Sequence, residues 1–449
     1  MEKKSSALDM TSGSIAKLLV TFAVPLLLGN MFQMLYNTVD ALVVGNFVGK
    51  EALAAVGSTA SITNIAVLFF NGVSVGGGVV ISQFYGAHDH ENLHKAIETT
   101  MAVTFMIGVL FTILGVLTVP YMLRFMSTPE DVMGEAGVYL RIYFAGIAGL
   151  LVYNMASGIL RAVGDTAKPL LFLILSSILN ILLDLLFVVV LRAGIEGVAL
   201  ATILSQFISA AAVLTLLSRS RDIYRFSWKE LTVDRPILSK ILSVGLPSGV
   251  QAMITAFSNV FVQSYINSFG SGCMAGWSCY NKLDQFVFLP VTSMSQSATT
   301  FVSQNIGAGQ AKRADRGTRV SILISVGITT CVAAVLFVVA RPAVAMFNRE
   351  PDVVQYGVLF LRMNVFFLIA NTVNHVLAGS LRGRGDGKGP MFIMIISFVA
   401  IRQTYLFLIT RLVQSEAAVG FGYPVGWMSC CVIELIYYWL RWGRKAKEG

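Results

Sequence analysis

Long apolar runs separated by short polar segments fill the chain from end to end. Runs such as 102–119 and 170–191 have about the 20 residues that a helix needs to cross the roughly 30 Å hydrocarbon core of a membrane. About twelve such runs are present. The period-two alternation that a membrane barrel requires throughout its strands is rare. The pattern therefore predicts an all-α polytopic membrane protein with twelve transmembrane helices.

Two polar motifs recur later in the chain at one constant offset. SQxxGA occurs at 82–87 and again at 303–308, and LRxxGDxxxP occurs at 160–169 and again at 381–390. Each copy of the first motif ends a long apolar run and begins a basic loop. Because both motifs share the offset, chance does not explain them, and we infer two tandem copies of one six-span unit.

The duplication predicts two six-helix lobes. Since each copy has an even number of spans, both copies enter the membrane in the same direction, and a pseudo-two-fold axis along the membrane normal should relate them. We expect an N-lobe at 1–218 and a C-lobe at 241–449, joined by a charged cytoplasmic linker at 219–240. Substrate sites in such repeat transporters typically lie between the halves, near the middle of the membrane.

Composition agrees with a membrane protein, and the charge distribution predicts its orientation. Of the 449 residues, 55% are hydrophobic and 13% are charged, and the mean hydropathy of +0.73 excludes an ordinary soluble domain. Most of the 33 lysines and arginines lie in alternate loops, which predicts that those loops and both termini are cytoplasmic. This bias explains the net charge of +9 without a nucleic-acid partner. The first apolar run lacks a small-residue cleavage site, so we expect a retained helix.

Polar side chains inside the first span share one helical face. Gln33, Asn37 and Asp40 follow one another at i, i+4 and i+7, with Tyr36 beside them. Because polar groups in hydrocarbon are costly, we interpret this face as pointing inward, toward a substrate cavity. The alternative is that Asp40 lies in the hydrated interface near the outer end of its helix.

A second acid lies in the fifth span. Asn180 and Asp184 are one helical turn apart, so their side chains point the same way. With Asp40 and the hydroxyl group of Thr202, they can form an oxygen cage for Na⁺, or the two carboxyl groups can bind a proton. The residue pattern leaves the choice of ion open. The alternative is that Asp184 caps a helix or pairs locally.

The second copy carries a different set of polar residues. Thr255, Asn259 and Gln263 repeat every four residues along the seventh span, as expected for a cavity lining or for hydrogen bonds between helices of one lobe. Tyr280 and Asp284 belong to a polar and aromatic cluster in the eighth span. Such a cluster suits an organic cation through cation–π and Coulomb attraction, although ordinary packing explains it equally well.

Two other charged groups of the second copy need partners. Arg402 in the eleventh span is a candidate partner for Asp284. Glu434 precedes Arg441 by two helical turns, and we expect these two to pair near the inner surface.

Matched prolines and missing motifs bear on mechanism. Pro25 and Pro247 occupy equivalent places in the two copies and should bend their helices, either as part of gating or as static kinks. The chain has no GxxxxGK[ST] phosphate loop, so an ion gradient rather than ATP should drive transport. No paired nucleophile and base or metal-ligand spacing is visible, so we predict neither an enzyme nor a resident cofactor.

The repeated motifs resemble those of bacterial multidrug and toxic compound extrusion (MATE) proteins. The resemblance rests on LRxxGD after spans four and ten, on SQFYGA at 82–87 and on FVSQNIGAG at 301–309, and it covers nearly the whole chain. It implies two six-helix lobes, a V-shaped cavity, and efflux of cationic amphiphiles in exchange for H⁺ or Na⁺.

The resemblance also carries a cation site in the N-lobe. Asp40 matches the acid of the family's first span, Asn180 and Asp184 match the NxxxD of span five, and Thr202 matches the threonine of span six. If the ion is Na⁺, the first three would be its ligands. Some branches of the family place carboxylates in spans seven and ten, where this chain has neutral residues. Coupling should therefore run through the N-lobe.

These observations together predict a cation-coupled antiporter that exports small organic cations by alternating access. We expect a monomer in the bacterial inner membrane. The alternative is a flippase for lipid-linked glycans, which would need basic residues in the cavity to bind a pyrophosphate. Only Lys282 and Arg402 qualify for that role.

Overall fold

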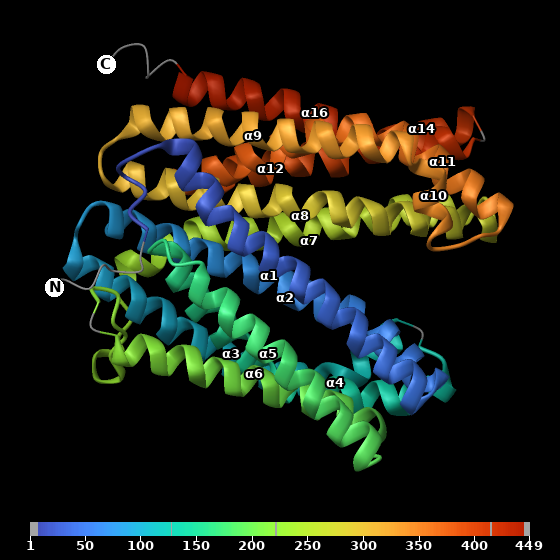
Figure 1. Cartoon of the computed structure of the whole chain (residues 1–449), viewed down its shortest axis with the longest axis horizontal. Helices are drawn as coiled ribbons and strands as arrows, with labels where there is room; N and C mark the ends of the chain where they lie inside the picture. Colours follow the sequence, from blue (N-terminus) through green and yellow to red (C-terminus); the bar gives the residue numbers. More distant parts are fainter. Residues whose placement is uncertain (1–7, 127, 221, 414, 444–449) are drawn as a thin grey trace. The chain divides into compact units, whose positions relative to one another are not determined.

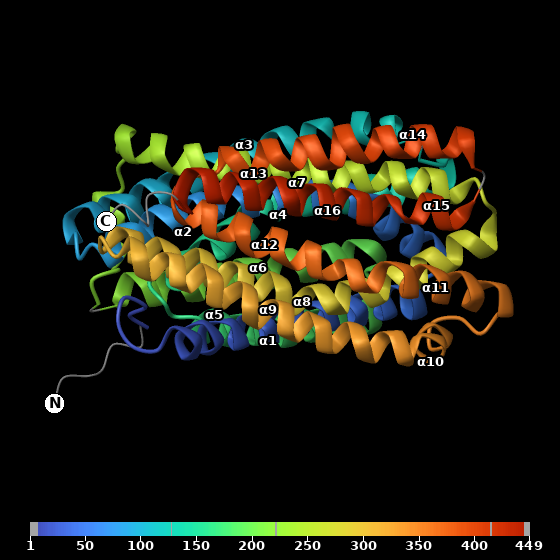
Figure 2. The same ribbon diagram turned by 90° about the horizontal axis from the view of Figure 1, so that it is seen from above.

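The computed structural model describes residues 8–126, 128–220, 222–413 and 415–443. These residues are almost entirely helical and contain no strand. Within each half the long helices run lengthwise and alternate in direction (Figure 1), and the view from above shows the same arrangement (Figure 2). The all-α prediction is confirmed.

Six long helices carry the first six predicted spans. They are α1 (Ile15–Val43), α2 (Lys50–Gly86), α3 (His90–Phe125), α4 (Glu130–Ala162), α5 (Ala167–Asp184) and α6 (Gly194–Arg219). Three short segments accompany them: the π-helical η1 (Val44–Val48) and η2 (Leu185–Val190), and the 3₁₀ segment η3 (Trp228–Glu230). The π-helical segments directly continue α1 and α5, the helices of the two predicted acids, and such segments are frequent at functional sites.

The remaining spans are more often interrupted. The α-helices are α7 (Arg235–Asn267), α8 (Ser271–Gly307), α9 (Ala311–Val338), α10 (Ala340–Ala345), α11 (Pro351–Asn364), α12 (Leu368–Gly383), α13 (Lys388–Met394), α14 (Arg402–Leu412), α15 (Glu416–Gly420) and α16 (Gly422–Tyr438). The irregular helical segments are η4 (Val365–Phe367), η5 (Ile395–Ile401) and η6 (Trp439–Gly443).

Eleven helical segments of the described chain are long and apolar enough to cross a membrane. α8 has 37 residues, but its polar content lowers its hydropathy below that of the others. With α8 the number of spans is twelve, as predicted.

Two compact units make up the chain. Of the described residues, 8–9 and 24–245 belong to the first unit, and 10–23 and 246–443 belong to the second. Two of the boundaries therefore fall inside helices, α1 and α7, and each lies directly before the residue that precedes a proline, Pro25 or Pro247. The predicted boundaries of the lobes and of the linker stay a prediction.

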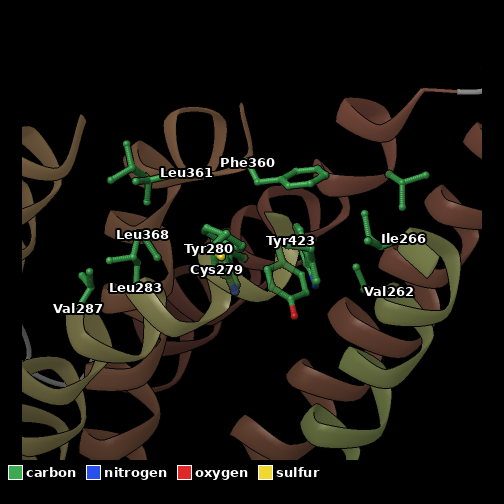
Figure 3. Close-up of a cluster of buried hydrophobic side chains, with 14 of the residues drawn as sticks. Val262, Ile266, Cys279, Tyr280, Leu283, Val287, Phe360, Leu361, Leu368 and Tyr423 are labelled. Atoms are coloured by element: carbon green, nitrogen blue, oxygen red, sulfur yellow. The ribbon is translucent and has the colours of Figure 1, made fainter. Parts of the chain in front are cut away.

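Several aromatic residues pack with aliphatic ones in a buried cluster of the second unit (Figure 3). The Trp277 ring lies about 5 Å, centroid to centroid, from the rings of Tyr280, Phe360 and Tyr423. Trp277 and Tyr280 have no exposed surface. Because these rings come from α8, α11 and α16, the cluster holds three helices together around one side of α8.

Glycines allow α2 and α7 to approach closely within the first unit. A Cβ atom on Gly76 would lie 2.4 Å from the carbonyl oxygen of Ile241 and 2.6 Å from the Cα of Gly245. A Cβ on Gly245 would lie 2.9 Å from the carbonyl oxygen of Val73. Small residues at such crossings let helix backbones meet in membrane proteins.

Candidate functional site

The two acids predicted to bind a cation meet in the first unit. Asp40 is on α1 and Asp184 is the last residue of α5, and their carboxyl groups lie within electrostatic range of each other. No donor reaches Oδ1 of Asp40 or either carboxyl oxygen of Asp184. Because a carboxylate only accepts hydrogen bonds, a proton or a bound cation would satisfy these oxygens.

Tyrosines surround this pair of acids. Tyr36 on α1 and Tyr139 on α4 lie within electrostatic range of both acids, and Tyr143 on α4 lies within range of these two tyrosines. The Tyr139 and Tyr143 rings stack with centroids 6.2 Å apart. Neither Tyr139 nor Tyr143 was predicted from the sequence as a site residue. Their one-turn spacing in the fourth span was the signal that could have revealed them.

Neutral oxygen atoms that could act as cation ligands are present on α5 and α6. Asn180 is buried one turn before Asp184, and neither its Nδ2 nor its Oδ1 has a hydrogen-bond partner. The Thr202 hydroxyl donates to the carbonyl oxygen of Val198 at 3.0 Å within α6, which leaves its oxygen lone pairs available. These donors fit a hard cation.

Acids alone do not complete a metal site here. In the part of the chain that the structure describes, no group of three or more His, Cys, Asp or Glu residues is arranged to hold a metal ion. A Na⁺ ion at Asp40 and Asp184 would therefore need neutral oxygens, of which Asn180 and Thr202 are the predicted ones.

Other predicted cavity residues on α1 lie at the surface. Gln33 and Asn37 are exposed, whereas Tyr36 and Asp40 are half-buried. The helix therefore turns its amides and its acid toward different surroundings. A cavity role for Gln33 and Asn37 stays a prediction.

In the second unit, Asp284 lies among aromatic hydroxyl groups. Tyr280, one turn before it on α8, and Tyr423 on α16 are both within electrostatic range of its carboxyl group. Neither Oδ1 of Asp284 nor the buried hydroxyl of Tyr280 has a hydrogen-bond partner. The acid and these rings form the type of environment that attracts an organic cation.

The predicted pairing of Arg402 with Asp284 is wrong. No ion pair joins these two described residues. Instead, Nη2 of the buried Arg402 donates to Oγ of Ser258 and, at 3.0 Å, to Oδ1 of Asn259. Its guanidinium also lies 5.3 Å from the centroid of the Tyr423 ring. Neutral oxygens on α7 and an aromatic face thus take the place of a carboxylate.

The polar stripe along α7 is used within the second unit. Thr255 donates to the carbonyl oxygen of Gln251 at 2.9 Å, and Gln263 donates to Oδ1 of Asn267 at 2.7 Å. Asn259 accepts the hydrogen bond from Arg402. Hydrogen bonding inside the lobe, the alternative interpretation, accounts for these contacts, and the cavity lining stays a prediction.

A buried acid in α16 was misjudged from the sequence. Glu434 has no exposed surface, and no donor reaches either of its carboxyl oxygens. Its charged neighbour is Arg382 on α12. The expected pairing with Arg441 is wrong, because Arg441 donates to the Tyr437 hydroxyl at 2.8 Å on the exposed side of the helix. The position of this single acid inside an apolar run was the sequence signal that could have indicated its burial.

Comparison with known proteins identifies the family. The model of the MatE family matches residues 25–186 and 247–404, one match in each sequence repeat. The chain belongs to the MatE family. The resemblance predicted from the repeated motifs is confirmed, and this MatE protein is a membrane transporter rather than an enzyme.

Relatives of this MatE protein align over nearly its whole length. "Probable multidrug resistance protein YpnP" of Bacillus subtilis is 30% identical over 97% of this chain and 98% of its own. "Probable multidrug resistance protein NorM" of Thermotoga maritima is 24% identical over 89% of this chain and 87% of its own.

A solved structure shows the same fold. It is described as the "Outward-facing conformation of a multidrug resistance MATE family transporter of the MOP superfamily". It matches with a TM-score of 0.92 at 23% identity and covers 99% of both chains. The two-lobed, twelve-helix fold predicted for this MatE protein is thereby confirmed.

Proposed function

We propose that this protein exports organic cations, including drugs, in exchange for H⁺ or Na⁺ by alternating access. The observation that carries the proposal is that the buried carboxyl oxygens of Asp40 and Asp184 lie within electrostatic range of each other and that no donor reaches them. Relatives named as multidrug resistance proteins support the substrate class. The coupling ion is a transported substrate, so no resident cofactor is needed.

The charge of the two acids explains how an ion can be coupled to transport. An Asp carboxylate within a membrane helix costs roughly 2.5 to 3.5 kcal/mol on insertion scales. Two such charges close to each other also repel, so a proton or a Na⁺ ion stabilises the pair. Asn180 and Thr202 supply additional oxygens if the ion is Na⁺. Binding and release of the ion would then change the electrostatic energy of the first unit.

The second unit supplies groups that suit the exported molecule. Asp284 offers a negative charge, and Tyr280 and Tyr423 offer aromatic faces beside it. A cation near such rings gains about 0.5 to 2 kcal/mol per contact, depending on its desolvation. We assign this cluster to substrate binding and the Asp40–Asp184 pair to ion binding.

Orientation and gating follow from sequence features. Because basic residues gather in alternate loops, both termini should be cytoplasmic, and a bacterial exporter of this type works from the inner membrane. Pro25 and Pro247 lie at the two places where a helix passes from one compact unit to the other. A helix bends most readily at proline, so these positions would absorb motion of one unit against the other.

The test is dye efflux from proteoliposomes in which a Na⁺ or a H⁺ gradient is imposed separately. We expect one of the two gradients to drive efflux by the unmodified chain. Asp40→Asn and Asp184→Asn should each reduce gradient-driven efflux to background, because an amide cannot bind the ion, while reconstituted amounts stay the same. Glu196→Gln, which removes an exposed acid from the same unit, is the matched control. Normal efflux by either Asp variant would refute ion coupling at this pair.

A further inference from the structure

A basic cavity lies at one end of the second unit. Its volume is about 750 Å³. It lies where α9 begins and where α12 and α16 end, and Figure 1 shows the start of α9 and the end of α16 at the same end of this unit. The residues that line the cavity are Ile15, Ile306, Gly309, Gln310, Ala311, Lys312, Arg313, Asp315, Arg316, Arg384 and Trp442.

Positive charge predominates in this cavity. Lys312, Arg313, Arg316 and Arg384 line it, and Asp315 is the single acid. Arg384 forms an ion pair with Asp315, so that negative charge is already balanced. Lys312 and Arg316 are exposed, and Arg316 has no ion-pair partner among the described residues. The remaining charge is suited to an anion.

The amino-terminal end of α9 adds to the positive potential of the cavity. α9 is 28 residues long, its first turn contains no acid, and Gln310 before it provides no side-chain cap. The amino end of a helix carries roughly half a positive charge, which acids usually offset. Here the first two turns carry Lys312, Arg313 and Arg316, and their one acid, Asp315, is paired with Arg384. Helix and side chains therefore attract the same kind of ligand.

The other walls of the cavity are apolar and aromatic. Ile15 and Ile306 line it, as does the ring of Trp442. The neighbouring Trp439 and Leu440 of η6 are at least half exposed, as expected for side chains that face lipid. Tryptophan is enriched where membrane helices reach the headgroup region. The cavity thus combines cationic groups with the interfacial end of membrane-spanning helices.

We propose that this cavity binds the phosphate of an anionic phospholipid. Basic pockets between membrane helices on the cytoplasmic side are suited to such headgroups. A soluble phosphate compound offers the same anion, but it would not use the apolar walls or the exposed side chains of η6. The site is independent of the Asp40–Asp184 pair and of the transported substrate.

The experiment measures lipid binding to the purified full-length chain by native mass spectrometry. The probes are dioleoyl phosphatidylglycerol, dioleoyl phosphatidylcholine and inorganic phosphate, each titrated separately. We expect phosphatidylglycerol to bind more tightly than phosphatidylcholine, and inorganic phosphate at equal concentration not to displace it. Removing one cation should weaken phosphatidylglycerol binding about fivefold, so the double variant Lys312→Gln with Arg316→Gln should lose about 25-fold.

Matched variants separate a built site from general surface charge. Arg319→Gln removes an exposed charge one turn further along α9, outside the cavity, and should leave the affinity unchanged. Arg316→Lys keeps the charge and should retain most of the binding. Equal losses in Arg319→Gln and Arg316→Gln would overturn the proposal, as would equal affinity for the two lipids. Displacement by inorganic phosphate would show a site for soluble anions and refute the lipid.

Discussion

The close approach of α2 and α7 predicts that neighbouring glycines respond oppositely to one added methyl group. Gly76 and Gly78 lie two residues apart on α2. A Cβ on Gly76 would clash with backbone atoms of Ile241 and Gly245, whereas a Cβ on Gly78 would have no atom within 4 Å. Backbone atoms cannot rotate away, so Gly76→Ala must push the helices apart.

The magnitude follows from comparing the two variants. Alanine is favoured over glycine inside a helix by about 0.8 to 1 kcal/mol, and both variants gain this amount. Their difference therefore reports the clash alone, for which overpacking typically costs about 1 to 3 kcal/mol. We expect Gly78→Ala to match or exceed the parent in stability and Gly76→Ala to be the less stable of the two by this amount.

Apparent melting temperatures in detergent, measured at one scan rate, test the comparison. Gly77→Ala provides an intermediate case, because its Cβ would lie 2.7 Å from a methyl group of the Thr100 side chain, which can move. The order of stability should be Gly78→Ala, then Gly77→Ala, then Gly76→Ala. If Gly76→Ala melted with Gly78→Ala, the helices would not be in backbone contact at this position, and the reasoning would be wrong.

Three further predictions concern the second unit. Trp277→Ala should cost about 3 to 5 kcal/mol because it empties the centre of the aromatic cluster, whereas Trp439→Ala at the surface should leave the melting temperature nearly unchanged. Glu434→Gln should not lower stability, since no donor reaches the carboxylate it replaces, but Arg382→Gln should cost about 1 to 3 kcal/mol, because it disturbs the hydrogen bond that Arg382 donates to Gln251 and removes the positive charge near the buried acid; melting curves of both variants, which should differ clearly, check this. Asp284→Asn should weaken binding of a fluorescent quaternary ammonium probe in equilibrium titrations, and unchanged affinity would place the substrate elsewhere.

Hydropathy and repetition were enough to predict the spans and the duplication, and the residues of the repeated motifs indicated the family by resemblance. The positions of Asp40 and Asp184 inside apolar spans also predicted that the two acids share one site. An acid within an apolar helix has few stable surroundings other than another acid with a shared proton or a cation. Their tyrosine neighbours, Tyr139 and Tyr143, could not be assigned. Aromatic residues are common in membrane helices, and one-turn spacing alone does not say which helix faces which.

Partners of buried charges were the least predictable feature. Arg402 was matched with Asp284 because opposite charges attract, but its reach and direction bring it to Ser258 and Asn259 instead. Glu434 was matched with Arg441 along one helix, whereas it is fully buried and its charged neighbour is Arg382 on α12. Spacing along a helix gives direction only relative to that helix. Which neighbour lies there depends on packing between helices.

Residues 10–23, near the start of the chain, belong to the compact unit that is synthesised last. Met10 donates its backbone N–H to Gln304 at 3.0 Å, Asn305 donates to the Met10 carbonyl at 3.1 Å, and Ser297 donates to the Leu19 carbonyl at 2.9 Å. At about 5 to 20 residues per second, α8 leaves the ribosome roughly 15 to 60 s after Met10. During biogenesis the start of α1 therefore lacks its final contacts until α8 has been synthesised. In that interval the insertion machinery could stabilise it, and stalled translation would leave it exposed to misfolding.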